Sequence, residues 1–546
     1  MSLLKILKRR NYVNHVLSTL IVIIIFLNIL YFAALPGNSH NLSRGYLVNT
    51  FSCKIADKNP IDPALATVVG PPSKLICAEP VVRISNGTIS LNEKHPKYNT
   101  ATCCYKEIRR LTSRNYTSWT VPDWSVRYSS CHAISKSEPR TEMNSEFAKI
   151  ECEFEKNGKI ETSQDFVATV LSPLEHSKST EAKYKYWKRP NSKIFYRKPP
   201  SVLIVGIDSV SRLHMMRSLP GTRKMLKAHD FVEMKGYTKI GENTFPNMMG
   251  GMGGMKFEDY PCWKTRHAKL DNCPFIWKNF SRNNYITGLI EDSAALGTFN
   301  FMKTGFVEQP TDYYLRPITT AYHGNINLET TYRGCVSGMN QTDFMMKYMR
   351  EVIAGINNEI PYFIWAWFTT VAHDDFNDLQ LVDNTFKRNL QELIHSEGKD
   401  TVILFISDHG YRFGKFRESF IGYYEESLPF FFIRLPPRLK HKYPFWSGIC
   451  TPLVFKKFLY VRQFEKTHEV TPVTDSYLDY QIAFEVTPSG AKYEAKGAFK
   501  GFLMSYPKGH FVQNCKHNHQ KAPEIWQEES DMYDAQGLSY NASNIA

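Results

Sequence analysis

The stretch SVLIVGIDS at residues 201–209 decides the fold. Its apolar run has no polar alternation, which is typical of a central parallel strand buried on both faces. Asp208 follows the run directly, and α/β sheets bind their ligands at the carboxyl ends of such strands. Asp208 is therefore a candidate site residue. The alternative is that it caps the N-terminus of the next helix.

The chain after this stretch alternates apolar runs with amphipathic segments. We expect further strands at 231–234, 285–290, 362–368 and 402–407, and helices at 211–229, interrupted near Pro220, and at 379–394. This alternation predicts an α/β fold with a doubly wound, mostly parallel sheet.

Acidic and imidazole side chains follow four of the expected strands. They are Asp208, Glu291 with Asp292, His373 with Asp374, and Asp408 with His409. A parallel sheet would gather them at one edge, where crowded carboxylates need a compensating cation, and Asp with His is ligand chemistry for zinc or manganese. Any one of these pairs alone would equally fit a cap or a buried core histidine.

Thr244, in the segment GENTFPN at 241–247, is the candidate nucleophile. A hydroxyl bound to a divalent cation loses its proton more readily and can attack phosphorus or sulfur. Without the acidic groups the segment predicts only a turn. The glycines within 248–254 would let backbone N–H groups approach an anion, or would simply permit tight turns.

The N-terminus carries a charge-free apolar segment at 16–35, preceded by Lys5, Lys8, Arg9 and Arg10. Its length suits a membrane span, and the basic residues predict a cytosolic N-terminus. We expect a single-pass type II membrane protein of the secretory pathway, in the Golgi or at the cell surface, anchored by a signal-anchor. The alternative is a cleaved signal peptide, which would give a secreted protein.

Sequons and cysteines fit a luminal or extracellular domain. Glycosylation sequons occur at Asn41, Asn86, Asn115, Asn279, Asn340 and Asn541. The 11 cysteines include no zinc-type Cys-x-x-Cys pair, so disulfides are expected, with one thiol left over. The net charge of +14 comes from dispersed basic residues, so we expect no nucleic-acid partner.

These patterns divide the chain into six parts. They are a basic cytosolic tail (1–15), the anchor (16–35), a cysteine-containing luminal region (36–180), a linker (181–200), the catalytic-type domain (201–515) and a C-terminal tail (516–546).

The motifs resemble those of the alkaline phosphatase and sulfatase superfamily. The matching phrases include VLIVGIDSVSRLHMMRSLPGT, GENTFPNMMG and ISDHGYRFGKFRESFIGYYEESLPFFFIRLP. Within that superfamily the chain is most similar to the animal proteins grouped as domain of unknown function 229, and CCYKEIRR at 103–110 resembles part of their N-terminal region.

This resemblance implies a set of roles. Asp208, Thr244, Asp408 and His409 would bind one metal ion, with Thr244 as the covalent nucleophile. His373, Asp374 and Asp292 would serve a second metal or the substrate. Arg412, Arg417 and Arg316 are candidates for binding the substrate anion, or are surface residues paired with Glu418 or Glu425.

Two departures from the superfamily pattern matter. Ser476 stands where two-zinc members have a further histidine, so one ion is expected rather than two. The Cys-x-Pro-x-Arg signature of sulfatases is absent from the sequence.

The sequence therefore predicts a metal-dependent hydrolase or transferase acting on a phosphate or sulfate ester, carried by a glycan or a lipid. The alternative is a catalytically impaired ectodomain of the same fold that serves as a glycan- or protein-binding module.

Overall fold

The computed structural model describes residues 45–49, 54–66, 68–85, 87–117, 121–136, 141–156, 158–189, 198–255, 257–265, 267–323, 335–356, 360–442, 454–463, 477–487, 492–500 and 512–515. In these ranges no helix combines the length and the apolar character that a bilayer crossing needs. The expected span at 16–35, both predicted tails, Ser476 and the sequons at Asn41, Asn86 and Asn541 lie outside the described residues, as does the side chain of Asn115.

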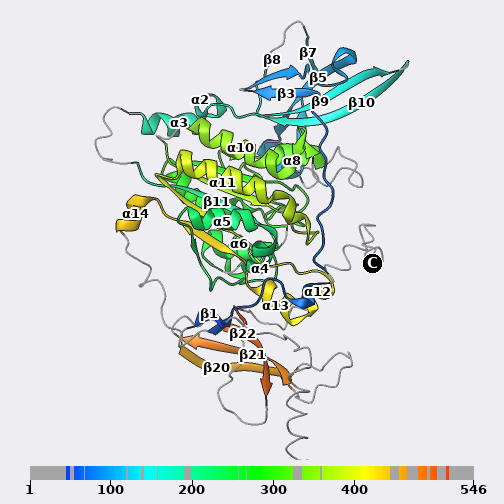
Figure 1. The fold of residues 1–546 in the computed structure, drawn as a ribbon. Helices are drawn as coiled ribbons and strands as arrows, with labels where there is room; N and C mark the ends of the chain where they lie inside the picture. Colours follow the sequence, from blue (N-terminus) through cyan, green and yellow to red (C-terminus); the bar gives the residue numbers. More distant parts are fainter. Residues whose placement is uncertain are drawn as a thin grey trace, which may run out of the picture.

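A seven-stranded mixed sheet forms the centre of the molecule (Figure 1). Its order is β12-β19-β18-β11-β17-β13-β14. The strands are β12 (Val232–Glu233), β19 (Phe431–Arg434), β18 (Thr401–Ile406), β11 (Ser201–Ile207), β17 (Tyr362–Phe368), β13 (Ile286–Glu291) and β14 (Tyr313–Tyr314). Strands β18, β11, β17, β13 and β14 are parallel, whereas β19 and β12 pair antiparallel at one side. The predicted α/β class with a mostly parallel sheet is confirmed.

The central strands are buried because their sequences are apolar on both faces. Every residue of β17 is buried, and β11 lies between β17 and β18. Gly206 of β11 permits this packing, since a Cβ there would stand 1.9 Å from the Trp367 ring. The continuous apolar run that defined the opening stretch therefore occupies the middle of the sheet.

Helices cover both faces of the sheet, as the doubly wound prediction requires. Residues of α5 (Pro220–Ala228), α10 (Gln341–Ile356) and α11 (Asp383–Glu397) share one core with Leu203 and Val205. Residues of α6 (Thr244–Gly253) and α7 (Ile276–Arg282) share a second core with Ile204, Trp365 and Trp367. The alternating side chains of β11 thus point into two separate cores.

Three expected helical or loop segments differ in detail. The helix predicted at 211–229 is split into α4 (Arg212–Ser218) and α5, as Pro220 indicated. The helix predicted at 379–394 begins as a 3-10 turn, Asp378–Val382, and becomes α11 only at Asp383. The glycine-rich stretch at 248–254 is not an open loop, because most of it belongs to α6, whose Met248, Met249 and Met252 are buried.

The larger part of the cysteine-containing N-terminal region, from Val82 onward, packs at one end of this core, whereas its start lies at the opposite end, where Leu47 and Ile55 share a cluster with Leu213 and Tyr424 (Figure 1). Its main sheet contains β5 (Ala101–Arg110), β6 (Val126–Tyr128), β7 (His132–Ile134), β9 (Phe147–Lys156) and β10 (Lys159–Ala168). Disulfides Cys103–Cys152 and Cys104–Cys131 lie within it, while Cys77–Cys335 ties the region to the segment before α10. Disulfides, including a fourth between Cys262 and Cys273, are therefore confirmed.

The stretch expected as a linker at 181–200 is in part a packed helix. Helix α3 (Lys178–Trp187) runs through its first residues. The Nζ of Lys183 in this helix lies 2.6 Å from Oδ2 of Asp312, and both side chains are buried. The start of this segment is therefore fixed to the core rather than acting as a spacer.

Smaller elements complete the described chain. They are β1 (Tyr46–Asn49), β2 (Lys54–Ala56), β3 (Val82–Ser85), β4 (Thr88–Leu91), β8 (Thr141–Glu142), α2 (Pro173–His176), α8 (Arg316–His323), β15 (Cys335–Val336), β16 (Met339–Asn340), α12 (Gly414–Glu418), α13 (Phe420–Ser427), α14 (Pro437–Lys442), β20 (Val454–Gln463), β21 (Tyr477–Thr487), β22 (Lys492–Lys500) and β23 (Val512–Cys515). Strands β20 to β23 form a separate antiparallel sheet.

Candidate active site

The site lies where neighbouring parallel strands end. Asp208 follows β11 directly, and Asp408 and His409 follow its neighbour β18 after Ser407. Thr244 begins α6, which covers the face of the sheet that carries Ile204 and Trp365. The sheet therefore brings together the four residues that the sequence analysis assigned to one metal ion.

The functional atoms of these residues are within contact distance of one another. The Thr244 hydroxyl donates to Oδ2 of Asp208 at 3.0 Å. Nε2 of His409 lies 3.2 Å from Oδ2 of Asp408 and 3.8 Å from Oδ1 of Asp208. The ligand atoms of Asp208, Asp408 and His409 all lie within 4.8 Å of one another, so this group could hold a metal ion.

The hydrogen bonds around the group leave one acceptor atom of Asp408 and one of His409 without a partner. Oδ1 of Asp408 accepts from the backbone N–H groups of Ser209 and His409, whereas its Oδ2 is buried without a partner. Nδ1 of His409 must donate to the Gly410 carbonyl at 2.8 Å, so Nε2 carries the free lone pair, and it too is buried without a partner. Two unsatisfied acceptors side by side fit a bound cation.

The pKa shifts of the buried group also fit a bound cation. Burial, and then the charge of Asp408, raise the pKa of Asp208, and burial also raises the pKa of Asp408. Burial, and then the nearby Arg412, lower the pKa of His409 to about 4, so its imidazole is neutral at physiological pH. A neutral imidazole between two carboxylates is the donor set that Zn²⁺ or Mn²⁺ prefers.

Local backbone geometry fixes these side chains. Ser209 adopts a left-handed conformation with φ of 62°, and its hydroxyl donates to Oδ1 of Asp208. Gly410 follows His409 at a point where a Cβ would lie 2.3 Å from the Glu425 carbonyl oxygen. The strained residue and the obligatory glycine hold the loop of Asp208 and the loop of His409 against each other.

Thr244 occupies the first position of α6. Asn243 precedes it as the N-cap but makes no side-chain cap hydrogen bond. Asn247 instead uses its side chain to accept from the backbone N–H groups of Ile240 and Gly241, which holds the preceding loop. The positive end of the helix dipole therefore lies at the Thr244 hydroxyl, where it stabilises negative charge.

His373 lies at the same edge but outside the ligand group. Its Nδ1 lies 2.6 Å from Oδ1 of Asp374, and this contact together with the charge of Asp208 raises its pKa against the effect of burial. Asp374 thus binds His373 instead of joining the ligand group, and its side chain is half exposed.

Asp292 does not serve as a ligand in this geometry. Its two carboxylate oxygens accept from the backbone N–H groups of Thr369 and Thr370 and from the Thr370 hydroxyl. Glu291 accepts from the N–H of Thr298. Both acids hold loops, and Asp292 holds the loop that carries His373.

The three candidate anion-binding arginines have different surroundings. Arg316 is buried, donates to the carbonyl oxygens of Asp123 and Ala294, and stacks over Trp124. Arg417 pairs with Glu426 through its Nε at 2.9 Å, rather than with the expected Glu418 or Glu425. Arg417 is thus already paired with an acid, and Arg316 is held by backbone carbonyl groups beside Trp124 with its Nη2 buried without a partner, whereas Arg412 follows His409 by three residues.

The sequence analysis missed a buried charge cluster beside the site. Nζ of Lys239 lies 2.5 Å from Glu426 and 3.1 Å from Glu242, and Arg417 contacts the same two acids. The charge of Lys239 also contributes to the low pKa of His409. No sequence spacing signals this cluster, because Lys239 and Glu426 are 187 positions apart.

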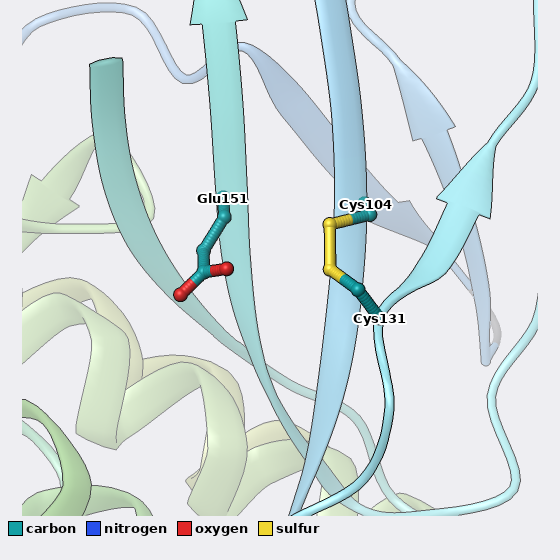
Figure 2. Close-up of side chains that lie close together, drawn as sticks. All are labelled: Cys104, Cys131 and Glu151. Carbon is teal, nitrogen blue, oxygen red and sulfur yellow. A yellow bond between two sulfur atoms is a disulfide. The ribbon is translucent and has the colours of Figure 1, made fainter.

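A second group of metal-type residues has a different explanation. Cys104, Cys131 and Glu151 lie close together, but the two sulfur atoms form a disulfide (Figure 2). Glu151 is paired with Lys106 and Lys149. The thiolates that a metal would need are therefore absent from this group.

Two of the predicted sequons have described side chains. Asn279 is exposed on α7. Asn340 is half-buried, and both ends of its side-chain amide bond to Asp343 at the start of α10. Asn279 is thus the more accessible acceptor of the two.

The sheet and the buried Asp–His group define an α/β protein with a candidate metal-dependent site. The chain belongs to the family described as protein of unknown function (DUF229), whose model matches residues 73–450. The family resemblance drawn from the motifs is thereby confirmed. No curated protein matches the chain.

Several solved structures are similar to the chain. They include a phosphonate monoester hydrolase from Silicibacter pomeroyi (9% identity, TM-score 0.36, covering 63% of this chain and 96% of that chain). A protein in the alkaline phosphatase superfamily from Vibrio parahaemolyticus shows 11% identity and a TM-score of 0.35, and the match covers 62% of this chain and 88% of that chain. The lipoteichoic acid synthase LtaP from Listeria monocytogenes shows 13% identity and a TM-score of 0.32, and the match covers 47% of this chain and 71% of that chain. These values assign neither a substrate nor an activity to this chain.

Proposed function

We propose that this protein is a metal-dependent hydrolase or transferase that acts on a phosphate or sulfate ester through Thr244. The observation that carries the proposal is the contact between the Thr244 hydroxyl and Asp208, beside the two unsatisfied acceptor atoms of Asp408 and His409. A nucleophile, a helix N-terminus and a metal-type donor set meet at one point, and together they suit transfer of an anionic group.

The residues act as follows. Asp208 accepts the hydrogen bond of the Thr244 hydroxyl and so orients its oxygen for in-line attack. The new bond joins Thr244 Oγ1 to phosphorus or sulfur while the ester bond breaks, and the alcohol leaves with the proton that Thr244 gives up. Water or a second alcohol then attacks the Thr244 adduct, and its proton returns to the threonine. The first-turn N–H groups of α6 stabilise the charge on the transferred group.

Asp208, Asp408, His409 and Thr244 would hold one zinc or manganese ion. Such an ion supplies Lewis-acid stabilisation of the charge that develops on the transferred group. We assign His373 to contact with the substrate, a role supported by its contact with Asp374, which favours the charged form of its ring.

The first test replaces the nucleophile. We expect Thr244→Ala to lower kcat for phosphodiester or sulfate ester hydrolysis by the full-length protein by about 10³-fold or more, since no other group attacks. Thr244→Ser, which keeps the hydroxyl, should retain part of the activity. Turnover by wild type that persists in Thr244→Ala would show that the nucleophile is wrong.

Metal analysis separates this proposal from the binding-module alternative, which is motivated by Ser476. We expect the purified protein to contain about one equivalent of zinc or manganese, and Asp408→Asn to lower that content. Chelation should lower the melting temperature, because a ligand that binds only the folded state stabilises it. A folded wild-type protein with no affinity for either ion would favour the glycan- or protein-binding role.

We also propose that the domain is luminal or extracellular and anchored as a type II membrane protein by residues 16–35. The disulfides support an oxidising compartment. A protease-protection assay on intact microsomes tests this, with antibodies against the first 15 residues and against the catalytic-type domain. Protection of the tail and digestion of the domain would contradict the orientation.

A further inference from the structure

Arg412, three residues after His409, forms no ion pair or hydrogen bond with any other described residue, and its Nε is buried without a partner. Its guanidinium carbon lies 5.4 Å from the centre of the Phe413 ring. That ring meets His373 edge-on, with centroids 5.3 Å apart. Arg412 thus belongs to the same side of the site as His373.

Its charge acts on both histidines of the site. After burial, Arg412 is the largest influence that lowers the pKa of His409, and it also opposes the raised pKa of His373. The guanidinium therefore belongs to the charged groups that surround the two histidines.

The other cations around the Asp-His loop are neutralised. Lys239 and Arg417 share Glu426 and Glu242. Arg217 forms a bidentate pair with Glu425 at 2.7 Å. Of these cations only Arg412 has its charge uncompensated.

A charge count then distinguishes classes of substrate. One divalent ion would cancel Asp208 and Asp408, which leaves the positive charge of Arg412 beside them. A singly charged anion balances that charge. A doubly charged anion would leave a negative charge uncompensated in a buried place, which is costly, and an ionised Asp292 would increase that cost.

We infer that the site takes a singly charged ester, a phosphate diester or a sulfate monoester, in preference to a doubly charged phosphate monoester, and that Arg412 binds its non-bridging oxygens. This inference rests on the proposed function. The planar guanidinium fork suits two oxygens of one tetrahedral anion. The transfer step is the one given above, with Thr244 as the attacking group.

The turnover experiment compares three substrates at pH 8 with the metal-loaded full-length protein. They are bis(4-nitrophenyl) phosphate, 4-nitrophenyl sulfate and 4-nitrophenyl phosphate. We expect one of the first two to exceed the monoester in kcat/KM by at least about 10-fold, and the better one identifies the transferred group. Arg412→Ala should lower that kcat/KM by about 10- to 100-fold, mainly through KM, with partial recovery in Arg412→Lys.

Arg388→Ala is the matched control, because Arg388 is exposed on α11 and pairs with Asp343. It should leave kcat/KM unchanged. A preference for the monoester, or an Arg412→Ala variant with unchanged kcat/KM, would overturn the inference. If the wild-type protein showed no Thr244-dependent turnover of any of the three substrates, that result would instead count against the proposed function.

A binding experiment tests the charge preference without turnover. Calorimetry on metal-loaded Thr244→Ala protein compares dimethyl phosphate, methyl sulfate and methyl phosphate at pH 8. We expect at least one singly charged ligand to bind more tightly than methyl phosphate, and Arg412→Ala to remove this advantage. Tighter binding of methyl phosphate, or no effect of Arg412→Ala, would refute the role of Arg412.

Discussion

Glu146 shows how a single buried acid sets a pH dependence. It lies among His176 of α2, Tyr348 of α10 and Tyr313 of β14, and burial raises its pKa to about 8. Nε2 of His176 donates to the Asp312 carbonyl, so its Nδ1, 3.4 Å from Glu146, can only accept a proton in the neutral ring. A protonated Glu146 is the partner that this geometry requires.

The consequence is a loss of stability at higher pH. Between about pH 4.5 and about 8 the folded chain holds a proton that the unfolded chain releases, so the unfolding free energy falls as pH rises. We expect Glu146→Gln to remove up to about 1.4 kcal/mol per pH unit of this slope. Thermal unfolding at pH steps from 5 to 8 measures it, with the exposed Glu142→Gln as control. Equal slopes in wild type and Glu146→Gln would contradict the assignment.

The sequence predicted the position of a side chain correctly where that side chain directly follows a strand of the central sheet. Asp208, Asp408 and His409 were predictable because the strands before them are continuous apolar runs. Arg417 and Asp292 were not, because their partners come from Glu426 and from the loop after β17. Only the tertiary structure shows which charges are already neutralised.

At the scale of elements, helix α13 connects the two site loops. Glu426 accepts from Lys239 ahead of Thr244, and its backbone carbonyl accepts from Gly410 after His409. Although burial opposes it, pairing with Lys239 and Arg417 lowers the pKa of Glu426. The helix thus ties the loop before Thr244 to the loop that carries Asp408 and His409.

Glu426→Gln should disturb both loops. The buried Lys239 and the partly exposed Arg417 would lose part of their compensation, and breaking a buried pair such as that of Lys239 with Glu426 costs up to about 3–5 kcal/mol. We expect a lower melting temperature and weaker metal binding, measured by thermal unfolding and by metal titration. Glu418→Gln, on the exposed side of neighbouring α12, should change neither. Wild-type metal affinity in Glu426→Gln would contradict the proposed role of Glu426 in positioning the two loops.

Helix α6 shows why some elements escape sequence prediction. Its glycines and proline have low helix propensity, so the pattern favoured a loop. The helix forms because Met248, Met249 and Met252 are buried against the sheet, which outweighs local preference. Strand β17, by contrast, matched its predicted bounds because burial and local preference agree.

At the scale of the whole molecule, the Cys77–Cys335 disulfide joins regions 258 residues apart, whereas Cys262–Cys273 spans 11. The entropy of the unfolded chain predicts stabilisation of roughly 5 kcal/mol for the first and about 3 kcal/mol for the second. We expect Cys77→Ser with Cys335→Ser to lower the melting temperature more than Cys262→Ser with Cys273→Ser. Scanning calorimetry under non-reducing conditions measures both, and the reverse order would contradict the entropic account.

The order of the sheet also determines when the site can exist during synthesis. Asp208 and Thr244 leave the ribosome early, but Asp408 and His409 reach the site only when β18 pairs with β11, about 200 residues after β11 in the chain, and β19 then adds to β18. This late, long-range pairing is slow to form. The nascent chain therefore lacks the complete group of Asp208, Thr244, Asp408 and His409 until most of the domain has been made, so any ion held by this group could bind only at a late stage of folding.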